Sequence, residues 1–537
     1  MITPARRYDD LVAEFRWDVP TEFNFGALVD AWATDRSRIA LYWEDERGRA
    51  ERHTFWDVAK ASNRAMNALA GLGVRRGDPV LVMLPRVPAW HAAIIGSLKL
   101  GAIVIPCAAS LRAKDIGYRV RHSGAKAVLT TAEQVPEVDA AVPDREALPV
   151  RLALGGAPAG WHDLDAVLAK ASTTGVPART RSDEPAICFY TSGTTKEPKA
   201  VLHTHSYTFA HRWTGEYWLD LRRTDLHWTT SDTGWAKAAW GVLYGPWMNG
   251  VPVFMYDGRF DPEREIDLLA RYEVSTFCAA PTEYRLLVKQ DLSRWRLPRL
   301  RHCVAAGEPL NPEVIRTWHE RFGLLVHDGY GQSEGGVLAA NLPCLPIRPG
   351  SMGKPFPGHD VRVIGEDGRE CPAGETGDLA LRGQPPSLFR EYWKNPEETA
   401  ACRRGEWYLT GDRARRDEDG YLWFVGRADD VIISAGYRIG PFEVESALLE
   451  HAAVLESAVV ASPDPDRGEI VKAFVVLRAG QPPTDALAKE LQDHVKRVTA
   501  PYKYPRAIEF VESLPKTVSG KIRRVELRER ERQRTSS

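Results

Sequence analysis

Cysteine is sparse in this sequence and follows no ligand pattern. The 537 residues include seven cysteines, an odd number, and no two of them form a Cys-x-x-Cys pair. Disulfide frameworks and zinc sites both need closely spaced cysteines, so neither is expected here. This usage fits a reducing compartment, and we predict a cytoplasmic protein.

Long apolar runs are also missing. The run from Ala92 to Pro106 is interrupted by Lys99, and it is shorter than the roughly 20 apolar residues of a membrane-spanning helix. The first residues, Met1 to Asp10, contain no apolar segment of the kind found in signal peptides. We therefore expect neither a membrane span nor a secretory signal.

Neither sign of charge is in excess. Lys and Arg total 71, Asp and Glu total 72, and the formal net charge is −1. A chain without a strong overall field has no electrostatic reason to bind nucleic acid or an anionic membrane. The expected partners are small molecules, and a homodimer is left open.

Three histidines close together in the sequence, His203, His205 and His211, raise the question of a metal site. No cysteine and no further ligand accompanies them at a metal-binding spacing. We interpret them as structural histidines.

Strands and helices alternate in the first third of the chain. Apolar spacing predicts helices over 55–72 and 89–100, and buried strands over 79–84, 102–105 and 127–130. This order predicts a parallel, doubly wound sheet. The next segment, up to Pro185, is rich in Pro, Ala and Gly without a clear period, and we predict a connector there.

The alternation resumes after residue 250. Strands are predicted at 251–255, 276–279, 302–305 and 324–326, and helices at 262–272, 281–290 and 312–322. In open α/β sheets, ligands bind beyond the carboxyl ends of the strands. The loops at 190–200, 306–310 and 329–334 should therefore converge on one crevice.

The chain divides near its last hundred residues. Short strands with Pro and Gly turns over 350–424 indicate a β-rich subdomain, and a boundary falls at 426–430. We predict an α/β fold with a large N-terminal domain, residues 1–428, of doubly wound sheets plus the β-rich subdomain. A small, mobile α+β C-terminal domain, residues 429–537, is predicted, with its final helix over 485–498 before the tail that carries Lys521. The alternating acidic and basic residues over 526–534 are typical of a solvated helix end.

One stretch has the composition of a phosphate-binding loop. Between two apolar runs stand Thr191, Ser192, Gly193, Thr194, Thr195, Lys196 and Lys199. Hydroxyl groups and backbone N–H groups of such a turn bind anions, and lysine adds positive charge. The spacing differs from G-x-x-x-x-G-K-[ST], which excludes the ordinary P-loop.

Six further motifs follow in order. They are Ala306-Gly-Glu-Pro-Leu310, Tyr330-Gly-Gln-Ser-Glu334, Tyr408-Leu-Thr-Gly-Asp412, Gly426-Arg-Ala-Asp-Asp430, Ser434-Ala-Gly-Tyr-Arg438 and Pro515-Lys-Thr-Val-Ser-Gly-Lys521. The ordered set resembles the adenylate-forming superfamily of acyl- and aryl-CoA synthetases, nonribosomal adenylation domains and luciferases. Asp232-Thr-Gly-Trp235 and the segment from Tyr437 to Glu445 are most similar to the medium-chain acyl-CoA synthetases. Lys196 and Ala200 depart from the family loop, where glycine is common.

The resemblance implies an ATP site. It assigns ATP or AMP contacts to Thr191, Ser192, Gly193, Thr194, Thr195, Lys199, Gly307, Glu308, Pro309, Tyr330, Gly331, Gln332, Ser333, Asp412, Arg427 and Lys521. In this assignment Gly307 lets the adenine approach the backbone, Asp412 accepts the ribose hydroxyls and Arg427 donates to the ribose.

The resemblance also implies the catalytic groups, Lys521, Glu334 and Thr191. Lys521 would bridge the reacting carboxylate and the α-phosphate, where one positive charge between two anions stabilises the transition state. Glu334 and Thr191 are the implied Mg²⁺ ligands, since Mg²⁺ prefers oxygen donors.

A second half-reaction would use CoA. Similar enzymes rotate the small domain about a hinge aspartate, which corresponds to Asp429. Gly436, Tyr437 and Arg438 would then line the CoA tunnel.

The acyl pocket is assigned to Trp235, Gly331, Trp240 and Tyr207. Gly331 stands where acetate-specific relatives carry tryptophan, so room for a longer acid is expected. Lys237 is interpreted either as a partner for the substrate or a nearby acid, or as a solvated lysine.

These assignments predict an ATP-dependent acid–CoA ligase that uses ATP, Mg²⁺ and coenzyme A. A medium-chain or branched fatty acid is the expected substrate, with an aryl acid as the alternative. Two rival functions are a stand-alone adenylation enzyme that loads a carrier protein and a non-enzymatic nucleotide-binding scaffold.

Overall fold

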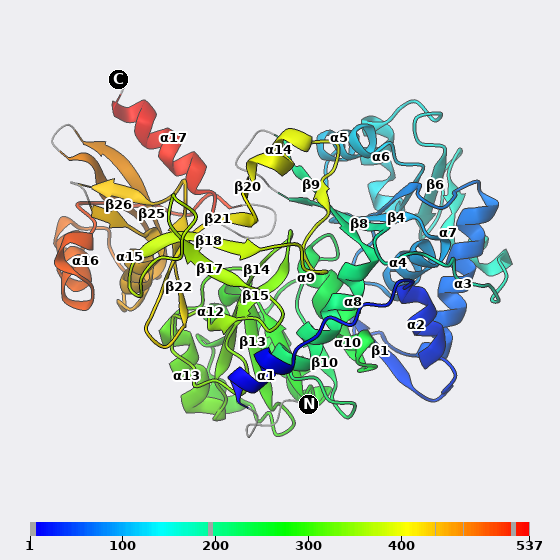
Figure 1. Ribbon diagram of the computed structural model, residues 1–537, viewed down its shortest axis with the longest axis horizontal. Helices are drawn as coiled ribbons and strands as arrows, with labels where there is room; N and C mark the ends of the chain where they lie inside the picture. The colour runs from blue at the N-terminus through cyan, green and yellow to red at the C-terminus, as the bar shows by residue number, and fades with distance from the viewer. Residues whose placement is uncertain (1–6, 192–196, 435–436, 465–466, 517–521, 536–537) are drawn as a thin grey trace.

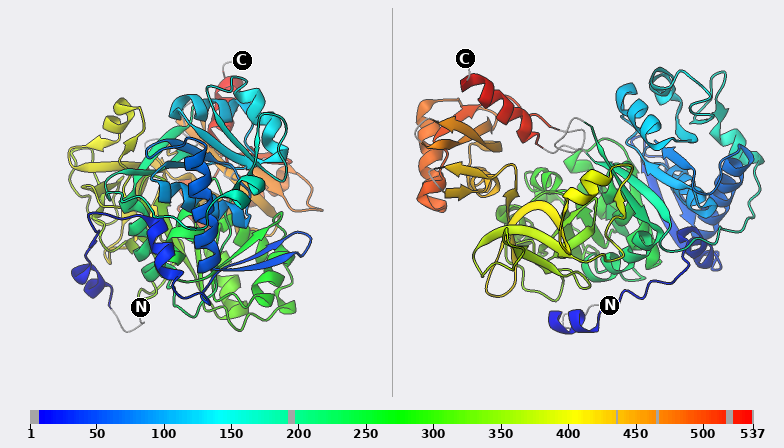
Figure 2. Two further views of the ribbon diagram at one scale, coloured as in Figure 1. Left: turned by 90° about the vertical axis from the view of Figure 1, so that its right-hand side faces the viewer. Right: turned by 45° about the horizontal axis from the view of Figure 1, so that its top comes forward.

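Four β-sheets follow one another from one end of the molecule to the other. The computed structural model describes residues 7–191, 197–434, 437–464, 467–516 and 522–535. Figure 1 shows the sheet that contains β4 and β6, blue to cyan, on the right. The sheet that contains β25 and β26, orange, lies on the left. The right-hand view of Figure 2 shows the same order, with green and yellow elements between these ends.

An eight-stranded sheet comes mostly from the first half of the chain and has the order β19-β9-β8-β4-β3-β5-β6-β7. Its strands are β3 (Pro79–Val82), β4 (Ile103–Pro106), β5 (Ala127–Thr131), β6 (Val150–Leu154), β7 (His162–Asp163), β8 (Pro185–Thr191), β9 (Lys199–Thr204) and β19 (Glu391–Tyr392). The strands from β8 to β7 are parallel, whereas β9 and β19 add antiparallel pairs at one edge. The parallel part confirms the predicted doubly wound sheet.

A nine-stranded sheet has the order β16-β15-β14-β13-β12-β10-β11-β1-β2. Its strands are β1 (Ile39–Asp45), β2 (Ala50–Thr54), β10 (His227–Thr229), β11 (Val253–Asp257), β12 (Thr276–Ala279), β13 (His302–Ala306), β14 (Val326–Gln332), β15 (Gly336–Ala340) and β16 (Lys354–Pro355). The strands from β14 to β1 are parallel. The four strands predicted after residue 250 are confirmed, although β14 begins later and extends further than expected.

Helices fill the space between and around these sheets. They are α1 (Tyr8–Glu14), α2 (Phe25–Trp32), α3 (Phe55–Gly71), α4 (Pro88–Leu100), α5 (Ala113–Ser123), α6 (Val135–Ala141), α7 (Leu164–Lys170), α8 (His205–Trp213), α9 (Ala236–Ala238), α10 (Gly245–Met248), α11 (Pro262–Arg271), α12 (Pro281–Leu287) and α13 (Pro312–Phe322). The largest buried cluster joins α2, α3, α4, α8 and α10 to Val104 on β4 and to Val253 on β11. These helices therefore form a layer between the two sheets. None of the helices in the described ranges has the length and hydropathy of a bilayer-spanning segment.

Local sequence signals explain where several helices begin and end. The Thr54 hydroxyl and the Asp57 carboxylate cap the start of α3 reciprocally. Helix α4 ends at Gly101, whose φ of 78° requires glycine. Asp261 accepts a hydrogen bond from the Arg264 N–H at the start of α11, and Pro262 follows it. These ends lie within two residues of the predicted ones.

The β-rich subdomain follows. Its sheet has the order β17-β18-β21-β20, with β22 paired to β21, and all pairs are antiparallel. The strands are β17 (Val361–Ile364), β18 (Thr376–Arg382), β20 (Arg403–Arg404), β21 (Trp407–Arg416) and β22 (Leu422–Arg427). A short helix, α14 (Pro396–Ala401), which the sequence did not predict, lies within this region.

The last sheet is formed by residues beyond 430. Its order is β24-β23-β26-β25, with β27 paired to β26. The elements are β23 (Ile432–Ser434), β24 (Tyr437–Ile439), α15 (Pro441–Leu449), β25 (Val454–Asp464), β26 (Gly468–Leu477), α16 (Asp485–Val498), β27 (Ala507–Phe510) and α17 (Arg524–Thr535). The prediction that the helix over 485–498 is the final one was wrong, because α17 follows it. The solvated helix end expected over 526–534 lies within α17, but Glu531 is buried there against Lys472 of β26, with 2.6 Å between Oε1 and Nζ.

The predicted connector up to Pro185 was also wrong. It contains α6, β6, β7 and α7, and β6 and β7 extend the parallel sheet. A charged residue hid β6 from the apolar pattern, because Arg151 is the second residue of the strand, and yet its side chain is only 2% exposed. The Arg151 guanidinium donates to Asp139 Oδ1 (2.6 Å) and to the Val142 carbonyl oxygen (2.7 Å), which compensates its burial.

Candidate active site

Hydrogen bonds connect the segments that flank the three loops predicted to converge. The Nε2–H of His203, on β9, donates to the Ser333 carbonyl oxygen at 2.7 Å. The carboxylate of buried Asp328, on β14, accepts a hydrogen bond from the Leu310 backbone. Strand β9, which follows the phosphate loop, is thus joined to the turn after β14, and the segment after β13 is joined to β14.

Glu334 lies in the turn between β14 and β15. Its carboxylate Oε1 accepts a hydrogen bond from the Tyr392 hydroxyl at 2.9 Å, and its backbone oxygen accepts one from the Phe389 N–H at 2.6 Å. Burial raises the pKa of Glu334, while the Tyr392 hydrogen bond and Lys199 act in the opposite direction. Burial and Glu334 raise the pKa of Tyr392 far above neutrality, so its hydroxyl is the donor.

Lys199 lies at the start of β9, opposite Thr191 at the end of β8. Its ammonium group pairs with the Glu398 carboxylate of α14 and lies 5.0 Å from the centre of the Tyr392 ring. The phosphate role predicted for Lys199 is consistent with this position beside Glu334. Ser192, Gly193, Thr194, Thr195 and Lys196 lie outside the described residues.

The donor set suits Mg²⁺ held jointly by protein and substrate. Mg²⁺ usually takes one or two carboxylates together with phosphate oxygens and water. No group of three or more His, Cys, Asp or Glu side chains placed to hold a metal occurs among the described residues. Glu334 supplies one carboxylate and Thr191 ends β8, so these two residues fit an ion that ATP also coordinates.

The predicted ribose carboxylate, Asp412, is buried within a polar cluster. Its Oδ2 accepts hydrogen bonds from the Tyr330 hydroxyl at 2.5 Å and from Gln332 Nε2 at 3.1 Å. The Tyr408 hydroxyl in turn donates to Gln332 Oε1 at 3.0 Å. Arg427 stands opposite Asp412 in the β21–β22 pairing. The structure thus brings together four of the residues assigned to nucleotide binding.

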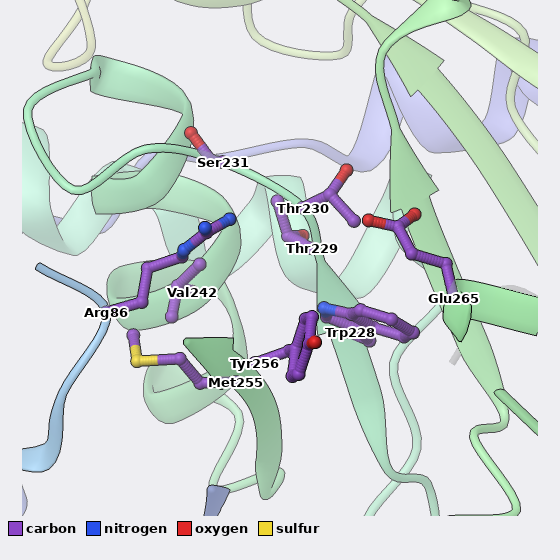
Figure 3. Close-up of a pocket in the computed structure, with 9 residues that line it drawn as sticks. All are labelled: Arg86, Trp228, Thr229, Thr230, Ser231, Val242, Met255, Tyr256 and Glu265. Atoms are coloured by element: carbon purple, nitrogen blue, oxygen red, sulfur yellow. The ribbon is translucent and has the colours of Figure 1, made fainter. Parts of the chain in front are cut away.

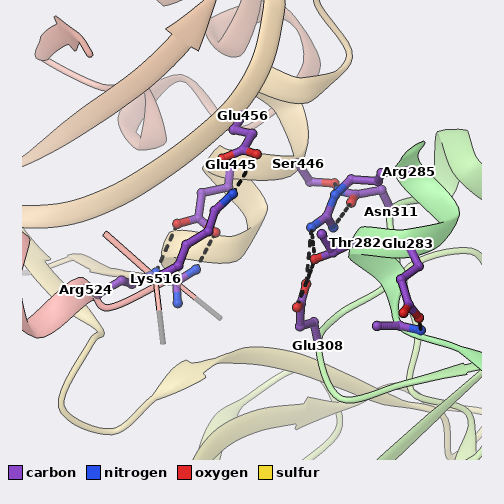
Figure 4. A network of polar contacts seen from close by, with 11 residues as sticks. Thr282, Glu283, Arg285, Glu308, Asn311, Glu445, Ser446, Glu456, Lys516 and Arg524 are labelled. Carbon is purple, nitrogen blue, oxygen red and sulfur yellow. Dashed lines mark hydrogen bonds and ion pairs between the residues drawn. The ribbon is translucent and has the colours of Figure 1, made fainter. Parts of the chain in front are cut away.

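The segment predicted to line adenine has an open backbone at Gly307. Its φ is 111°, and a Cβ built there would meet no atom within 4 Å. Glu308 turns away, accepting hydrogen bonds from the Thr282 hydroxyl (2.9 and 2.7 Å) and from Arg285 (3.2 Å). Arg285 also donates to Asn311 Oδ1 at 3.2 Å. A flat base can therefore approach Gly307, while Glu308 anchors the loop (Figure 4).

Lys521 lies outside the described residues, but the base of its loop is described. Lys516 pairs with Ile522 in a β-bridge. The Lys516 ammonium lies 2.8 Å from Glu456 Oε1, and Arg524 donates to both oxygens of Glu445 at 3.0 and 2.7 Å. Figure 4 shows both pairs side by side.

The predicted hinge aspartate, Asp429, lies on the surface between two arginines. Its carboxylate is 3.5 Å from Arg427 Nε and 3.6 Å from Arg528 Nη2 of α17. Arg528 also pairs with the buried Asp430. The hinge segment is thus tied to the last helix of the chain.

Of the three predicted CoA residues, Tyr437 is the one whose side chain the structure describes. Tyr437 is 52% exposed and stacks on Tyr502, with 4.4 Å between ring centres. Gly436 lies outside the described residues, and of Arg438 only the backbone, in β24, is described. Their CoA role stays a prediction.

Two of the predicted acyl-pocket residues, Tyr207 and Trp240, are buried. Tyr207 is fully buried between His203 and His211, and Trp240 is buried against Trp218. Trp235 is half-buried at the start of α9. Tyr207 and Trp240 are therefore core residues in this structure.

At Gly331, where room for a longer acid was expected, there is no space for a side chain to begin. A Cβ there would lie 2.1 Å from the Gly336 carbonyl oxygen, where β14 and β15 approach each other. This close strand approach requires glycine at 331 for a backbone reason.

Lys237 is not a solvated lysine. Its Nζ is buried and has no hydrogen-bond partner among the described residues, and it favours the charged form of Glu265 electrostatically. Burial, and then Glu283, raise the pKa of Glu265. Figure 3 shows Glu265 and Arg86 on either side of Thr230, around a cavity of about 10 Å³, which is the size of one water.

The three neighbouring histidines are buried core residues. Burial lowers the pKa of His203 and His211 to about 3 and that of His205 to about 4, so all three are neutral at pH 7. All seven cysteines carry free thiols.

The sequence reasoning missed Tyr392 and Glu398, which contact Glu334 and Lys199. They stand in Glu391-Tyr-Trp-Lys-Asn-Pro-Glu-Glu398, where nothing in the spacing points to chemistry. The local signal available was a helix start, Pro396-Glu-Glu398, that follows the tyrosine by four residues.

Comparisons with known proteins cover almost the whole chain. The AMP-binding enzyme family matches residues 28–393, and the AMP-binding enzyme C-terminal domain matches residues 443–521. The uncharacterized acyl–CoA ligase YtcI of Bacillus subtilis (strain 168) is 47% identical over 98% of both chains. The mitochondrial acyl-coenzyme A synthetase ACSM3 of Mus musculus is 44% identical over 98% of this chain and 93% of its own. The crystal structure of the anthranilate CoA ligase AuaEII with anthranoyl-AMP has a TM-score of 0.90 at 31% identity, over 97% of this chain and 100% of its own.

Proposed function

This chain belongs to the AMP-binding enzyme family, and from that premise we propose that it is an AMP-forming acid–CoA ligase. It converts a carboxylate, ATP and CoA into acyl-CoA, AMP and pyrophosphate. The observation that carries the proposal is a series of contacts. Tyr392 links Lys199 to Glu334. Gln332, two residues before Glu334, binds Asp412. A phosphate lysine, a metal carboxylate and a ribose carboxylate together fit one nucleotide triphosphate.

In the first half-reaction, a carboxylate oxygen of the acid attacks the α-phosphorus of ATP, and pyrophosphate leaves. Lys199 and the hydroxyls of the loop from Thr191 bind the phosphates, and Lys521 neutralises charge between the two reacting anions. Glu334 and Thr191 would hold Mg²⁺, and the bound ion would supply positive charge for the phosphate oxygens. Asp412 and Arg427 hold the ribose, which fixes the α-phosphate in place.

In the second half-reaction, the CoA sulfur attacks the acyl carbon, its proton is lost, and AMP leaves. We assign this step to a second domain arrangement, in which rotation about Asp429 brings Gly436, Tyr437 and Arg438 to the acyl-adenylate. The exposure of Tyr437 supports this, since a surface ring is available for another contact. In this proposal the boundary between the two domains lies between residues 428 and 429. The free cysteines favour a cytoplasmic location for the protein.

The proposed acid is a medium-chain or branched fatty acid, in line with the similarity to ACSM3. An aryl acid is the second candidate, because the anthranilate ligase AuaEII superposes over nearly the whole chain. We also retain loading of a carrier protein in place of CoA as a rival acceptor.

The deciding experiment measures AMP release with ATP, Mg²⁺ and acids from acetate to decanoate plus benzoate, with and without CoA. CoA-dependent turnover that is highest at intermediate chain length supports the proposal. Acid-dependent pyrophosphate exchange without thioester formation would instead indicate a carrier protein as acceptor.

A substitution of Lys521 separates the two half-reactions. Lys521→Ala should abolish acid-dependent pyrophosphate exchange, because nothing then neutralises the two reacting anions. Thioester formation from supplied acyl-adenylate should persist. Equal loss of both steps in a folded variant would contradict the role proposed for Lys521.

A further inference from the structure

A short segment, residues 389–399, covers the phosphate-loop hairpin. Its strand β19 pairs with β9, placing Tyr392 opposite Val201. Backbone hydrogen bonds from Arg390 N–H to the Leu202 oxygen (2.8 Å) and from Trp393 N–H to the Ala200 oxygen (2.7 Å) fix the segment on the hairpin. We name it the covering segment.

Tyr392 is held rigidly within the covering segment. It is 6% exposed, and its backbone N–H donates to the Thr399 hydroxyl oxygen at 3.0 Å. The Thr399 hydroxyl in turn donates to the Asn395 carbonyl oxygen at 2.8 Å. A buried ring with a fixed backbone has little freedom to turn, so its hydroxyl direction is set.

The hydroxyl of Tyr392 is directed at Glu334. The 2.9 Å hydrogen bond to Oε1 and the 2.6 Å hydrogen bond from the Phe389 N–H to the Glu334 backbone oxygen both come from the covering segment. One element therefore orients both the backbone and the carboxylate of Glu334. Partners of this kind orient metal ligands and raise metal affinity.

The ring of Tyr392 contacts the other functional group of the site. The Lys199 ammonium lies 5.0 Å from the ring centre, within the range of a cation–π interaction, and pairs on its other side with Glu398. Lysine has a flexible stem, so two contacts that confine its ammonium group prepare it for phosphate.

We propose that Tyr392 is a positioning residue with two separable roles, in which its hydroxyl aims Glu334 at Mg²⁺ and its ring confines Lys199 for the ATP phosphates. This inference rests on the proposed ligase function for the identity of the nucleotide. It assigns no chemical step to Tyr392.

The two roles can be separated by two substitutions. Tyr392→Phe keeps the ring and removes the hydroxyl, whereas Tyr392→Leu removes both. ATP binding is measured by calorimetry in EDTA and again during a Mg²⁺ titration, and the Mg²⁺ concentration for half-maximal acid-dependent pyrophosphate exchange is measured alongside.

For Tyr392→Phe, ATP binding in EDTA should be unchanged, because Lys199 keeps its ring contact. The Mg²⁺ concentration for half-maximal effect should rise about tenfold, as expected when a ligand's orienting partner is removed. For Tyr392→Leu, ATP binding in EDTA should also weaken, by about twofold to fivefold.

Tyr421→Phe is the matched control, since its hydroxyl donates to the Pro346 carbonyl oxygen at 2.7 Å in a different part of the molecule. It should leave both ATP binding and Mg²⁺ dependence as in the wild type. The proposal would be overturned if Tyr392→Phe needed the same Mg²⁺ concentration for half-maximal effect as the wild type. It would also be overturned if both Tyr392 variants lost the same ATP affinity in EDTA. If the unmodified protein binds ATP but shows no acid-dependent exchange, the ligase function fails, while the calorimetric comparison still tests Tyr392.

Discussion

At the scale of single residues, buried polar groups in this molecule owe their properties to partners distant in the sequence. Lys99 interrupts an apolar run, yet it is fully buried and contacts Asp30 and Asn63 through its ammonium group, at 2.5 and 2.6 Å. Arg151 is similarly compensated within β6 by Asp139. A charged residue in an apolar run therefore marked a buried ion pair, which tolerates burial only while both partners are present.

Gly331 provides a test at this scale. Gly331→Ala should reduce pyrophosphate exchange at least tenfold with every acid, since the added Cβ forces β14 from β15 and disturbs Gln332 and Glu334. Such overpacking costs about 1–3 kcal/mol. The measurement is exchange over the acid panel for Gly331→Ala and Gly331→Trp.

The tryptophan that acetate-specific relatives carry at this position predicts a different result for Gly331→Trp, namely a shift in preference toward acetate or propionate. Near-normal exchange for Gly331→Ala, together with a preference of Gly331→Trp for shorter acids, would show that residue 331 limits the length of the acid. This result would contradict the explanation by close strand approach.

At the scale of elements, α15 and α17 are joined by a buried ion pair. Glu445 of α15 is 5% exposed and accepts two hydrogen bonds from Arg524, at the start of α17, and one from the Val459 N–H at 2.8 Å. A carboxylate near the start of a helix commonly stabilises that helix by its charge. The structure uses the carboxylate to tie two helices and β25 together instead.

Arg524→Leu should therefore destabilise the C-terminal sheet by about 3–5 kcal/mol, because Glu445 is left buried without its cation. Urea denaturation gives the change in stability, and hydrogen–deuterium exchange should show loss of protection in α15 and α17.

The matched control is Lys516→Leu, which breaks the neighbouring but more exposed pair with Glu456. It should cost about 0–1 kcal/mol. Equal effects of the two substitutions would show that burial does not decide the strength of these pairs.

At the scale of the whole molecule, neutral histidines are distributed through the core. Burial lowers the pKa of His91, His203, His205, His211, His227, His302, His327 and His359 to about 3–4. The unfolded chain binds these protons near pH 6.5, whereas the folded chain does not. Their contribution to stability is therefore complete above pH 6.5 and is lost as the pH falls toward 3–4.

The free energy of unfolding should consequently fall as the pH is lowered from 7.5 to 5.5. Each histidine contributes a slope of up to about 1.4 kcal/mol per pH unit. Carboxyl groups whose pKa is raised by burial act in the opposite direction, among them Asp328 (to about 7), Glu265 and Glu334, but such groups are fewer than the histidines. Urea midpoints at pH 7.5, 6.5 and 5.5 measure the effect, and a constant midpoint would contradict it.

Much of the fold followed from local signals. Prolines and caps at Asp261 and Pro312, and the glycine at 101, set helix ends because they act on the adjacent backbone. Predictions failed where a charged residue was compensated from elsewhere, as in β6, and where the final helix uses Glu531 for a buried contact with Lys472.

The site divides in the same way. The sequence determined which residue types meet at the carboxyl ends of the strands, because those residues stand in motifs attached to predicted strands and turns. It did not determine their partners, since Tyr392 and Glu398 are about two hundred residues from Lys199, and Asp412 is eighty from Tyr330 and Gln332.

By itself the sequence determined much of the order of strands and helices and the family chemistry, because backbone preferences and motif residues are encoded locally. Only the tertiary structure decided that Gly331 is required by a close strand approach, that Tyr207 is a core residue, and that Tyr392 lies between Glu334 and Lys199. The physical reason is that packing, hydrogen bonding and burial depend on which distant segments share a volume.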